Sequence, residues 1–167
     1  LVSNLLEFAR PRARTSVRTD LREVLANAAE SVETAFGSRG VRLETDAGTN
    51  PVWVDGDPRD LEQVFVNLLT NARDAAPDGT LVGCVLSVED GHARLAVRDR
   101  GPGLPREAGD RLFRPFFTTK KSGGTGLGLA ISREIVLRHG GEIGLSPRAG
   151  GGTEAWVILP LAPGREP

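Results

Sequence analysis

A long amphipathic helix over residues 57–76 is followed at once by a β-hairpin over residues 80–99. Asp57 can cap this helix, and Pro58 suits its first helical position. The dipeptide Asp90-Gly91, typical of tight hairpin turns, joins the two strands. A helix next to an antiparallel hairpin does not fit strict strand–helix alternation. It indicates an α+β fold.

The rest of the chain supports this fold class. Because helices and hairpins mix, we expect a two-layer α/β sandwich with one sheet under a helical layer. Residues 1–9 have the spacing of the last turns of a helix, and residues 10–18 are a basic stretch without acids, typical of a linker. Further helices are predicted over about 20–36 and 126–139, and strands over 41–45, 52–54, 80–89, 92–99, 142–146 and 153–159.

Composition excludes several classes of protein. The chain has 167 residues, enough for one domain, and 21 Lys and Arg against 22 Asp and Glu, so no global charge attracts nucleic acid or anionic lipid. No apolar run reaches the length of a membrane span. The single cysteine, Cys84, excludes an intrachain disulfide, and its apolar surroundings predict a buried thiol. The chain has no methionine, so we expect a piece of a longer protein.

Asn67 and Asn71 lie one turn apart beside the apolar stripe of the helix over residues 57–76. An amide carbonyl can ligate Mg²⁺ without adding a buried charge, and Mg²⁺ usually takes only one or two protein oxygens. The pair also fits two hydrogen-bonded amides at the border of a core. The spacing alone leaves both interpretations open.

Asp99 ends a predicted strand on its core side, because Ala93, Leu95 and Val97 alternate with it. A buried carboxylate needs a partner. Glycines follow at 101 and 103 and allow a planar ligand to approach the backbone. A carboxylate here would accept from the exocyclic amine of adenine, and an Asp-x-Gly turn is the alternative.

Two further segments have the chemistry of a phosphate site. Residues 123–129 are glycine-rich and open a helix, whose N-terminal amides and dipole favour anions, although a plain entry loop also fits. Between them and Asp99, residues 112–121 hold three phenylalanines in a glycine-flanked, irregular stretch. This pattern suggests a lid with apolar anchors, from which Lys120 or Lys121 would reach phosphate.

In this order and spacing, the motifs resemble the catalytic, ATP-binding domain of bacterial sensor histidine kinases over about residues 20–160. The Pro-Phe-Phe-Thr-Thr-Lys form of the third motif is similar to that of the nitrogen-regulation type. The segments that correspond to the family's N, G1, F and G2 boxes are Asn67-Leu68-Leu69-x-Asn71-Ala72, Asp99-x-Gly101-x-Gly103, Phe113-x-Pro115-Phe116-Phe117 and Gly124-Thr125-Gly126-Leu127-Gly128-Leu129.

The resemblance implies the Bergerat fold, a mixed sheet covered by helices, with ATP and Mg²⁺ bound between the helices and a lid. Asn71 would coordinate Mg²⁺, Asp99 would bind the adenine amine, and Asn67 and Lys120 would serve catalysis on the phosphate side. The implied nucleotide-binding set is Asn67, Asn71, Asp74, Asp99, Gly101, Gly103, Thr118, Lys120, Gly124, Thr125, Gly126, Leu127, Gly128 and Thr153.

Two positions depart from the family pattern. Asp74 stands where many members have a lysine, which shifts the expected phosphate contact toward Lys120. Arg114 stands where glutamate is common before the Pro-Phe-Phe motif.

The phospho-accepting histidine of the family is absent. His92 follows a hairpin turn, and His139 ends a helix, where an imidazolium suits the helix dipole. Neither is followed directly by an acidic residue, as the acceptor motif requires.

The resemblance therefore implies three parts: 1–18, the end of a dimerisation helix and a linker; 19–161, the ATP-binding catalytic domain; and 162–167, a tail. The implied partners are ATP, the dimerisation and phosphotransfer domain of the same parent, and the receiver domain of a response regulator. No nucleic acid is expected. The parent is expected to be a cytoplasmic homodimer, with membrane anchorage left open, and this chain a monomer or weak dimer.

The chain is thus expected to be a protein-histidine kinase domain that donates the γ-phosphate of ATP but lacks the acceptor. One alternative is an ATPase of the same superfamily, and another is a nucleotide-binding module without kinase activity. Such ATPases need a carboxylate one turn before the metal-binding asparagine, and here that position is Asn67, an amide that cannot act as a base.

Overall fold

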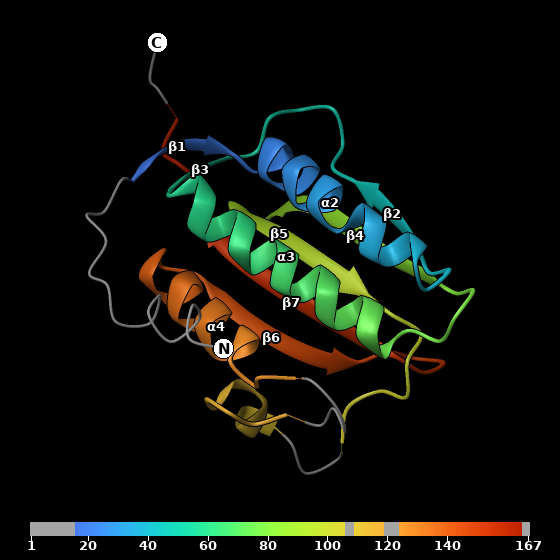
Figure 1. Cartoon of the computed structure of the whole chain (residues 1–167). Coiled ribbons are helices and arrows are strands. Elements are labelled where there is room, and N and C mark those ends of the chain that lie inside the picture. Colours follow the sequence, from blue (N-terminus) through green and yellow to red (C-terminus); the bar gives the residue numbers. More distant parts are fainter. Residues whose placement is uncertain (1–15, 106–108, 119–123, 165–167) are drawn as a thin grey trace.

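The computed structural model describes residues 16–105, 109–118 and 124–164 and has two layers (Figure 1). Three helices cover one face of a five-stranded sheet, which confirms the predicted α+β sandwich. The helices are α2 (Leu21–Gly37), α3 (Pro58–Ala75) and α4 (Gly128–Arg138), with a short 3₁₀ helix η1 (Gly109–Phe113). The strands are β1 (Val17–Asp20), β2 (Arg42–Asp46), β3 (Trp53–Gly56), β4 (Leu81–Glu89), β5 (His92–Arg98), β6 (Glu142–Pro147) and β7 (Thr153–Pro160).

The five-stranded sheet has the order β2-β4-β5-β7-β6. Strands β2 and β4 are parallel and the other neighbours are antiparallel, so the sheet is mixed. The turn between β4 and β5 has positive φ at both Asp90 and Gly91, which confirms the predicted tight hairpin.

Strand β1 differs from the expectation. Residues 17 and 18 were assigned to the linker, but Val17 pairs with Gly56 and Arg18 with Asp55 in a separate two-stranded ribbon with β3. The Arg18 guanidinium also lies over the Trp53 ring, 5.5 Å from its centroid. The pairing joins segments almost forty positions apart, so no local pattern reveals it.

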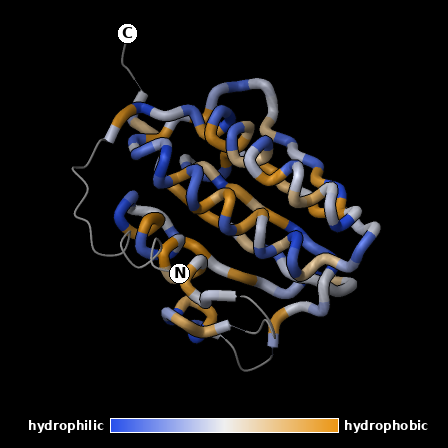
Figure 2. Tube along the Cα trace, in the orientation of Figure 1, coloured by the Kyte–Doolittle hydropathy of each residue, from blue (hydrophilic) through white to orange (hydrophobic). Residues whose placement is uncertain are grey.

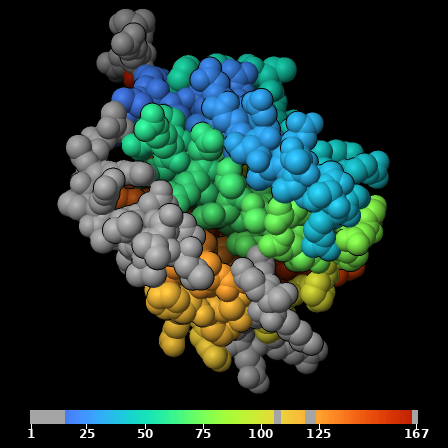
Figure 3. All heavy atoms as spheres, in the orientation of Figure 1, coloured from blue at the N-terminus to red at the C-terminus, as the bar shows by residue number. Residues whose placement is uncertain are grey.

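The core lies between the helices and the sheet. Helix α3 is central, with its apolar stripe fully buried, and Figure 2 shows hydrophobic residues along this helix and the strands behind it. Helices α2 and α3 lie side by side on the face shown in Figure 3. The predicted cap of α3 is confirmed, because the Asp57 carboxylate accepts from the N–H groups of Arg59 and Asp60 at 2.9 and 3.4 Å.

Cys84 is fully buried, as expected, and burial raises the pKa of its thiol to about 12. Among the described residues, no helix is both long and apolar enough to cross a membrane.

Asp20 anchors the start of α2. Its buried carboxylate accepts from the N–H groups of Arg22 and Val52 at 3.0 and 3.1 Å and pairs with the Arg22 guanidinium at 2.8 Å. Burial alone would raise the pKa of Asp20, but the hydrogen bonds from Arg22 and Val52 outweigh it and lower the pKa below its ordinary value of 3.8.

We therefore expect part of the fold's acid sensitivity to come from Asp20. Because its pKa is lower in the folded chain, the carboxylate stabilises the fold above about pH 4, and this contribution is lost as pH falls through the folded-state pKa. Asp20→Asn keeps a capping oxygen but removes the charge, and should cost about 1–3 kcal/mol at pH 7. Urea denaturation between pH 3 and 7 measures the effect, which should shrink toward pH 3. The exposed Asp55→Asn is the control, and an Asp20→Asn effect that does not change with pH would contradict the assignment.

Candidate nucleotide-binding site

The predicted site residues that the structure describes come from five places: helix α3, the loop after β5, the segment after η1, the loop that opens α4 and the start of β7. Asn67 of α3 connects two of them. Its side-chain Nδ2 donates to the Gly128 carbonyl at 3.2 Å and to Ser132 Oγ at 3.1 Å. Asn67 therefore fixes the first turn of α4 against the middle of α3, as a hydrogen-bonded amide at the border of the core.

Asn71 lies one turn further along α3 and is half-buried. No group of three or more His, Cys, Asp or Glu side chains that would hold a metal occurs among the described residues. A dedicated protein cage is thus absent from that part of the chain. The neutral amide oxygen of Asn71 suits an ion whose remaining ligands are water and phosphate.

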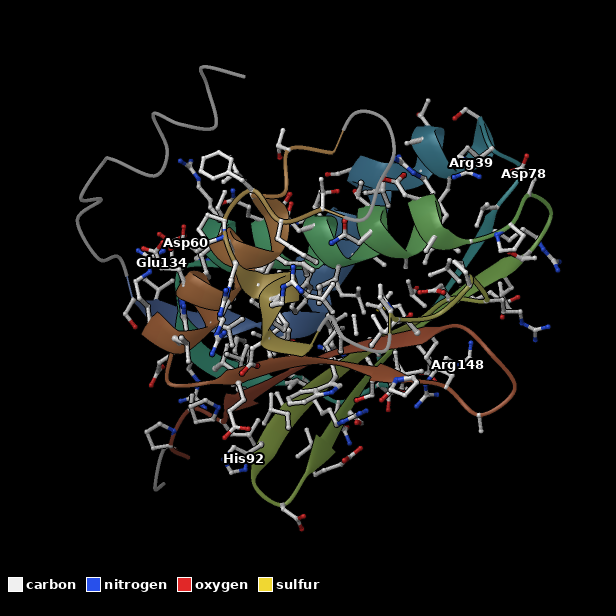
Figure 4. The ribbon with its side chains drawn as sticks, turned by 90° about the horizontal axis from the view of Figure 1, so that it is seen from below. Arg39, Asp60, Asp78, His92, Glu134 and Arg148 are labelled. Atoms are coloured by element: carbon white, nitrogen blue, oxygen red, sulfur yellow. The ribbon has the colours of Figure 1, made fainter. Side chains whose placement is uncertain are left out.

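The last turn of α3 is neutral where the family often has a positive charge. The Asp74 carboxylate pairs with the Arg73 guanidinium, at 2.6 Å from Nη2 and 2.9 Å from Nε. Arg39 then caps the helix, because it donates to two carbonyls of the last turn, to the carbonyl of the C-cap residue Ala76 and to the Asp78 carboxylate at 2.8 Å (Figure 4). A cation at a helix C-terminus also favours the helix dipole.

Asp99 is buried at the end of β5, with 4% of its surface exposed, as the strand alternation predicts. Its Oδ1 accepts from the N–H groups of Gly101 at 2.7 Å and Thr153 at 3.3 Å. Within the described part of the chain, Oδ2 has no hydrogen-bond partner. This oxygen is still accessible to solvent, because no fully buried side-chain nitrogen or oxygen there lacks a partner. The Asp-x-Gly turn is confirmed, and because it uses one oxygen and leaves the other open, the ligand interpretation stays a prediction.

Gly101 brings the loop after β5 against the C-terminal end of α3. A Cβ at this position would lie 2.5 Å from the Ala75 carbonyl oxygen. Only glycine allows this approach, which places Asp99 beside the last turn of α3. Gly103 follows in a left-handed conformation, near the Gly152 carbonyl.

The loop before α4 leaves the helix N-terminus open to an anion. The N-cap residue Leu127 is buried and forms no side-chain cap, while Thr125 Oγ1 accepts from its N–H at 3.4 Å. Gly124 is half-buried and Thr125 is exposed. The first amides of α4, with the helix dipole behind them, therefore suit phosphate.

The phenylalanine-rich segment folds against the start of α4. Phe116 N–H donates to the Gly126 carbonyl at 3.0 Å, and its side chain is 68% exposed. Phe113 lies under Arg133 and Phe117 under Arg111, at 5.5 and 5.1 Å. Thr118 is exposed. The predicted phosphate ligand Lys120 lies outside the described residues.

His92 and His139 have structural positions. His92 is exposed after the hairpin turn. His139 Nε2 accepts from the Asp57 N–H at 3.1 Å, and its Nδ1 bonds the Ile135 carbonyl at 2.8 Å. Because an amide N–H can only donate, the ring is neutral with its proton on Nδ1, and the expected imidazolium is corrected. His139 ties the end of α4 to the start of α3.

Three residues that hold this arrangement were not predicted from the sequence: Ser132, Arg39, and Arg148, whose guanidinium donates to the Asp99 main-chain carbonyl. Ser132 is fully buried one turn after Gly128, and a lone hydroxyl on an apolar stripe is the signal that points to such a partner. Arg39 and Arg148 donate hydrogen bonds to main-chain carbonyls. Because every residue has such a carbonyl, the pattern of side chains in the sequence does not reveal these contacts.

Residues 56–163 match the protein family described as histidine kinase-, DNA gyrase B- and HSP90-like ATPase. A similar curated protein is Sporulation kinase C of Bacillus subtilis (strain 168), 34% identical over 162 residues, which are 96% of this chain and 38% of that protein. The chain thus spans less than half the length of this relative. Among solved structures, a mycobacterial sensor histidine kinase MprB is 33% identical, with a TM-score of 0.79 over 89% of this chain and 99% of that one.

Two further solved structures are of full-length or complexed kinases. ShkA in complex with AMPPNP is 28% identical with a TM-score of 0.84, over 96% of this chain and 35% of that one. ThkA in complex with the response regulator protein TrrA is 25% identical with a TM-score of 0.82, over 99% of this chain and 47% of that one.

The approach of Gly101 to α3 can be tested with a matched pair of glycines. Gly101→Ala should cost about 1–3 kcal/mol, because a rigid backbone carbonyl occupies the space of the new methyl group. Gly83→Ala on β4, where nothing lies within 4 Å of the added Cβ, should be neutral or up to about 1 kcal/mol stabilising. Thermal unfolding of both variants measures the difference. Equal stability of the two would contradict the described contact.

His139→Ala should destabilise the chain by about 2–3 kcal/mol, since it removes two hydrogen bonds and leaves the Asp57 N–H without its partner. Urea denaturation at neutral pH measures the change. His92→Ala, at an exposed site, should stay within about 0.5 kcal/mol of the unaltered chain. A loss of the same size in both variants would show that His139 has no special role.

Proposed function

This chain belongs to the histidine kinase-, DNA gyrase B- and HSP90-like ATPase family, and from this we propose that it is the ATP-binding catalytic domain of a sensor histidine kinase of the nitrogen-regulation type. The observation that carries the proposal is the buried Asp99 carboxylate. One oxygen is held by two main-chain N–H groups and the other is open, beside an α3 that carries two asparagines and an α4 with an uncapped N-terminus.

Each part of ATP has a matching group. The open oxygen of Asp99 would accept the exocyclic amine of adenine, with Gly101, Gly103 and Thr153 around the ring. The amides at the start of α4, in the loop over Gly124–Gly128, would bind the phosphates. The AMPPNP complex of ShkA supports this proposal, since that nucleotide analogue binds a relative of the same fold.

Magnesium is proposed to bind at Asn71. The amide oxygen would ligate the ion, which would neutralise the charge of the phosphates during transfer. Lys120 and Thr118 would complete the phosphate side. Asp74 remains a proposed neighbour of the nucleotide whose charge is already balanced by Arg73.

The proposed reaction is transfer of the γ-phosphoryl group to a ring nitrogen of a histidine on the dimerisation domain of the same parent. The lone pair of the unprotonated ring nitrogen would form a bond to the γ-phosphorus as the bond to the bridging oxygen breaks, ADP would leave with that electron pair, and the proton on the other ring nitrogen would pass to solvent. The chain's own contribution is positioning and charge neutralisation. The phosphohistidine would then supply a response regulator, as the complex of ThkA with TrrA suggests.

A hydrolytic ATPase is the weaker candidate. It needs a carboxylate that takes a proton from water, and Asn67 is a neutral amide whose nitrogen is engaged by Gly128 and Ser132. The same contacts suit a domain that holds ATP without hydrolysing it until an acceptor histidine arrives. A cytoplasmic location follows for the proposed domain, because its phosphoryl donor is ATP.

Calorimetric titration of this chain tests the proposal. ADP and AMPPNP should bind more tightly with Mg²⁺ than without it. GTP should bind at least about ten-fold more weakly than these adenine nucleotides, because guanine has a carbonyl where adenine has the amine. Asn71→Ala should remove the Mg²⁺ dependence. Asn27→Ala, an exposed asparagine on α2, is the matched control and should bind as the unaltered chain does.

Two results would overturn the proposal. A folded chain that binds neither ADP nor AMPPNP has no nucleotide site. Steady release of phosphate from ATP, with water as the only acceptor, would make the chain an ATPase.

A further inference from the structure

Arg148 lies in the turn between β6 and β7, far in sequence from the proposed adenine-binding residue (Figure 4). Its half-buried side chain reaches back across the sheet end, and Nη1 donates to the main-chain carbonyl of Asp99 at 2.6 Å. Among the described residues, no other donor bonds this carbonyl. The contact is a charge-assisted hydrogen bond, which is stronger than a neutral one.

The β6–β7 turn is shaped to make this contact. Arg148 N–H donates to the Gly152 carbonyl and Gly151 N–H to the Arg148 carbonyl, both at 3.1 Å, so the turn closes on itself. Gly152 has a φ of +91° and packs directly on the Asp99 carbonyl, where a Cβ would collide with that oxygen. The carbonyl therefore lies between Gly152 and the Arg148 guanidinium.

The same turn fixes the carboxylate of Asp99. Asp99 N–H donates to the Thr153 carbonyl at 3.0 Å, and Thr153 N–H donates back to Asp99 Oδ1 at 3.3 Å. Arg148 thus holds the main chain on one side of Asp99, while Thr153 and Gly101 hold Oδ1 on the other. Together these contacts determine where the second oxygen, Oδ2, points.

We propose that Arg148 is a positioning residue for adenine selectivity: it fixes the Asp99 peptide so that Oδ2 meets the exocyclic amine of the base. This inference rests on the proposed function, since it requires an adenine nucleotide at Asp99. Arg148 acts through Asp99 and does not itself touch the base.

The test is the ratio of two dissociation constants, for ADP and for the diphosphate of purine riboside, which lacks the amine. Arg148→Ala should weaken ADP binding about ten-fold, equivalent to about 1.4 kcal/mol, and leave the amine-free nucleotide within about two-fold. Arg148→Lys, which keeps a charged donor, should restore most of the selectivity. Arg42→Ala, an exposed arginine at the opposite edge of the sheet, is the matched control.

A double-mutant cycle separates positioning from general stability. In an Asp99→Asn background, Arg148→Ala should no longer change the ratio, because the two residues act as one unit. Arg148→Met, which keeps the apolar stem, is measured in parallel and should show the same loss of selectivity, so that the test still stands if the alanine variant does not fold.

The outcomes distinguish this inference from the proposed function. An unaltered chain that binds no ADP overturns both. A selective unaltered chain whose Arg148→Ala and Arg148→Met variants keep the same ratio, or lose both nucleotides equally, overturns the inference alone.

Discussion

The burial of helix α3 is the constraint on which the rest of the structure depends. Its stripe of Leu61, Val64, Phe65, Leu68 and Leu69 is fully buried against the sheet and α2, and side chains of this kind stabilise a fold by about 1.5–3 kcal/mol each. Because this face must stay buried, α3 cannot rotate about its own axis, and the polar residues at the edge of the stripe therefore have fixed positions. Three contacts then place the neighbours of α3: His139 at its start, Asn67 in its middle and Arg39 at its end.

The buried carboxylate of Asp99 is the second constraint. Burial of an unpaired carboxylate is costly, and a structural salt bridge would be the usual remedy. Here Oδ1 receives two main-chain N–H groups instead, and no described cation bonds the carboxylate. The other oxygen is left open at the end of a core strand. The open oxygen is the position at which the proposed function places a ligand donor.

Local patterns predicted the parts of the fold that local chemistry decides. The Asp57 cap, the Asp90-Gly91 turn and the alternation that buries Asp99 each depend on residues close in sequence, and all are confirmed. Strand β1 was missed because its partner is β3, and the roles of Ser132 and Arg148 were missed because their partners lie 65 and 49 positions away. The site residues were proposed from the order of short motifs, whereas the groups that orient them belong to tertiary structure.

The departure at Asp74 changes how the phosphate end must be built. A lysine in the last turn of α3 would bring a free cation, but Asp74 and Arg73 pair with each other and leave that turn without net charge. The attraction for a polyphosphate must then come from elsewhere. In the proposed site the uncapped amides at the start of α4 would supply part of it, since the helix dipole and the N–H groups are fixed by the fold. Asn67 secures this helix start to α3, so the same contact would hold the proposed phosphate site in place.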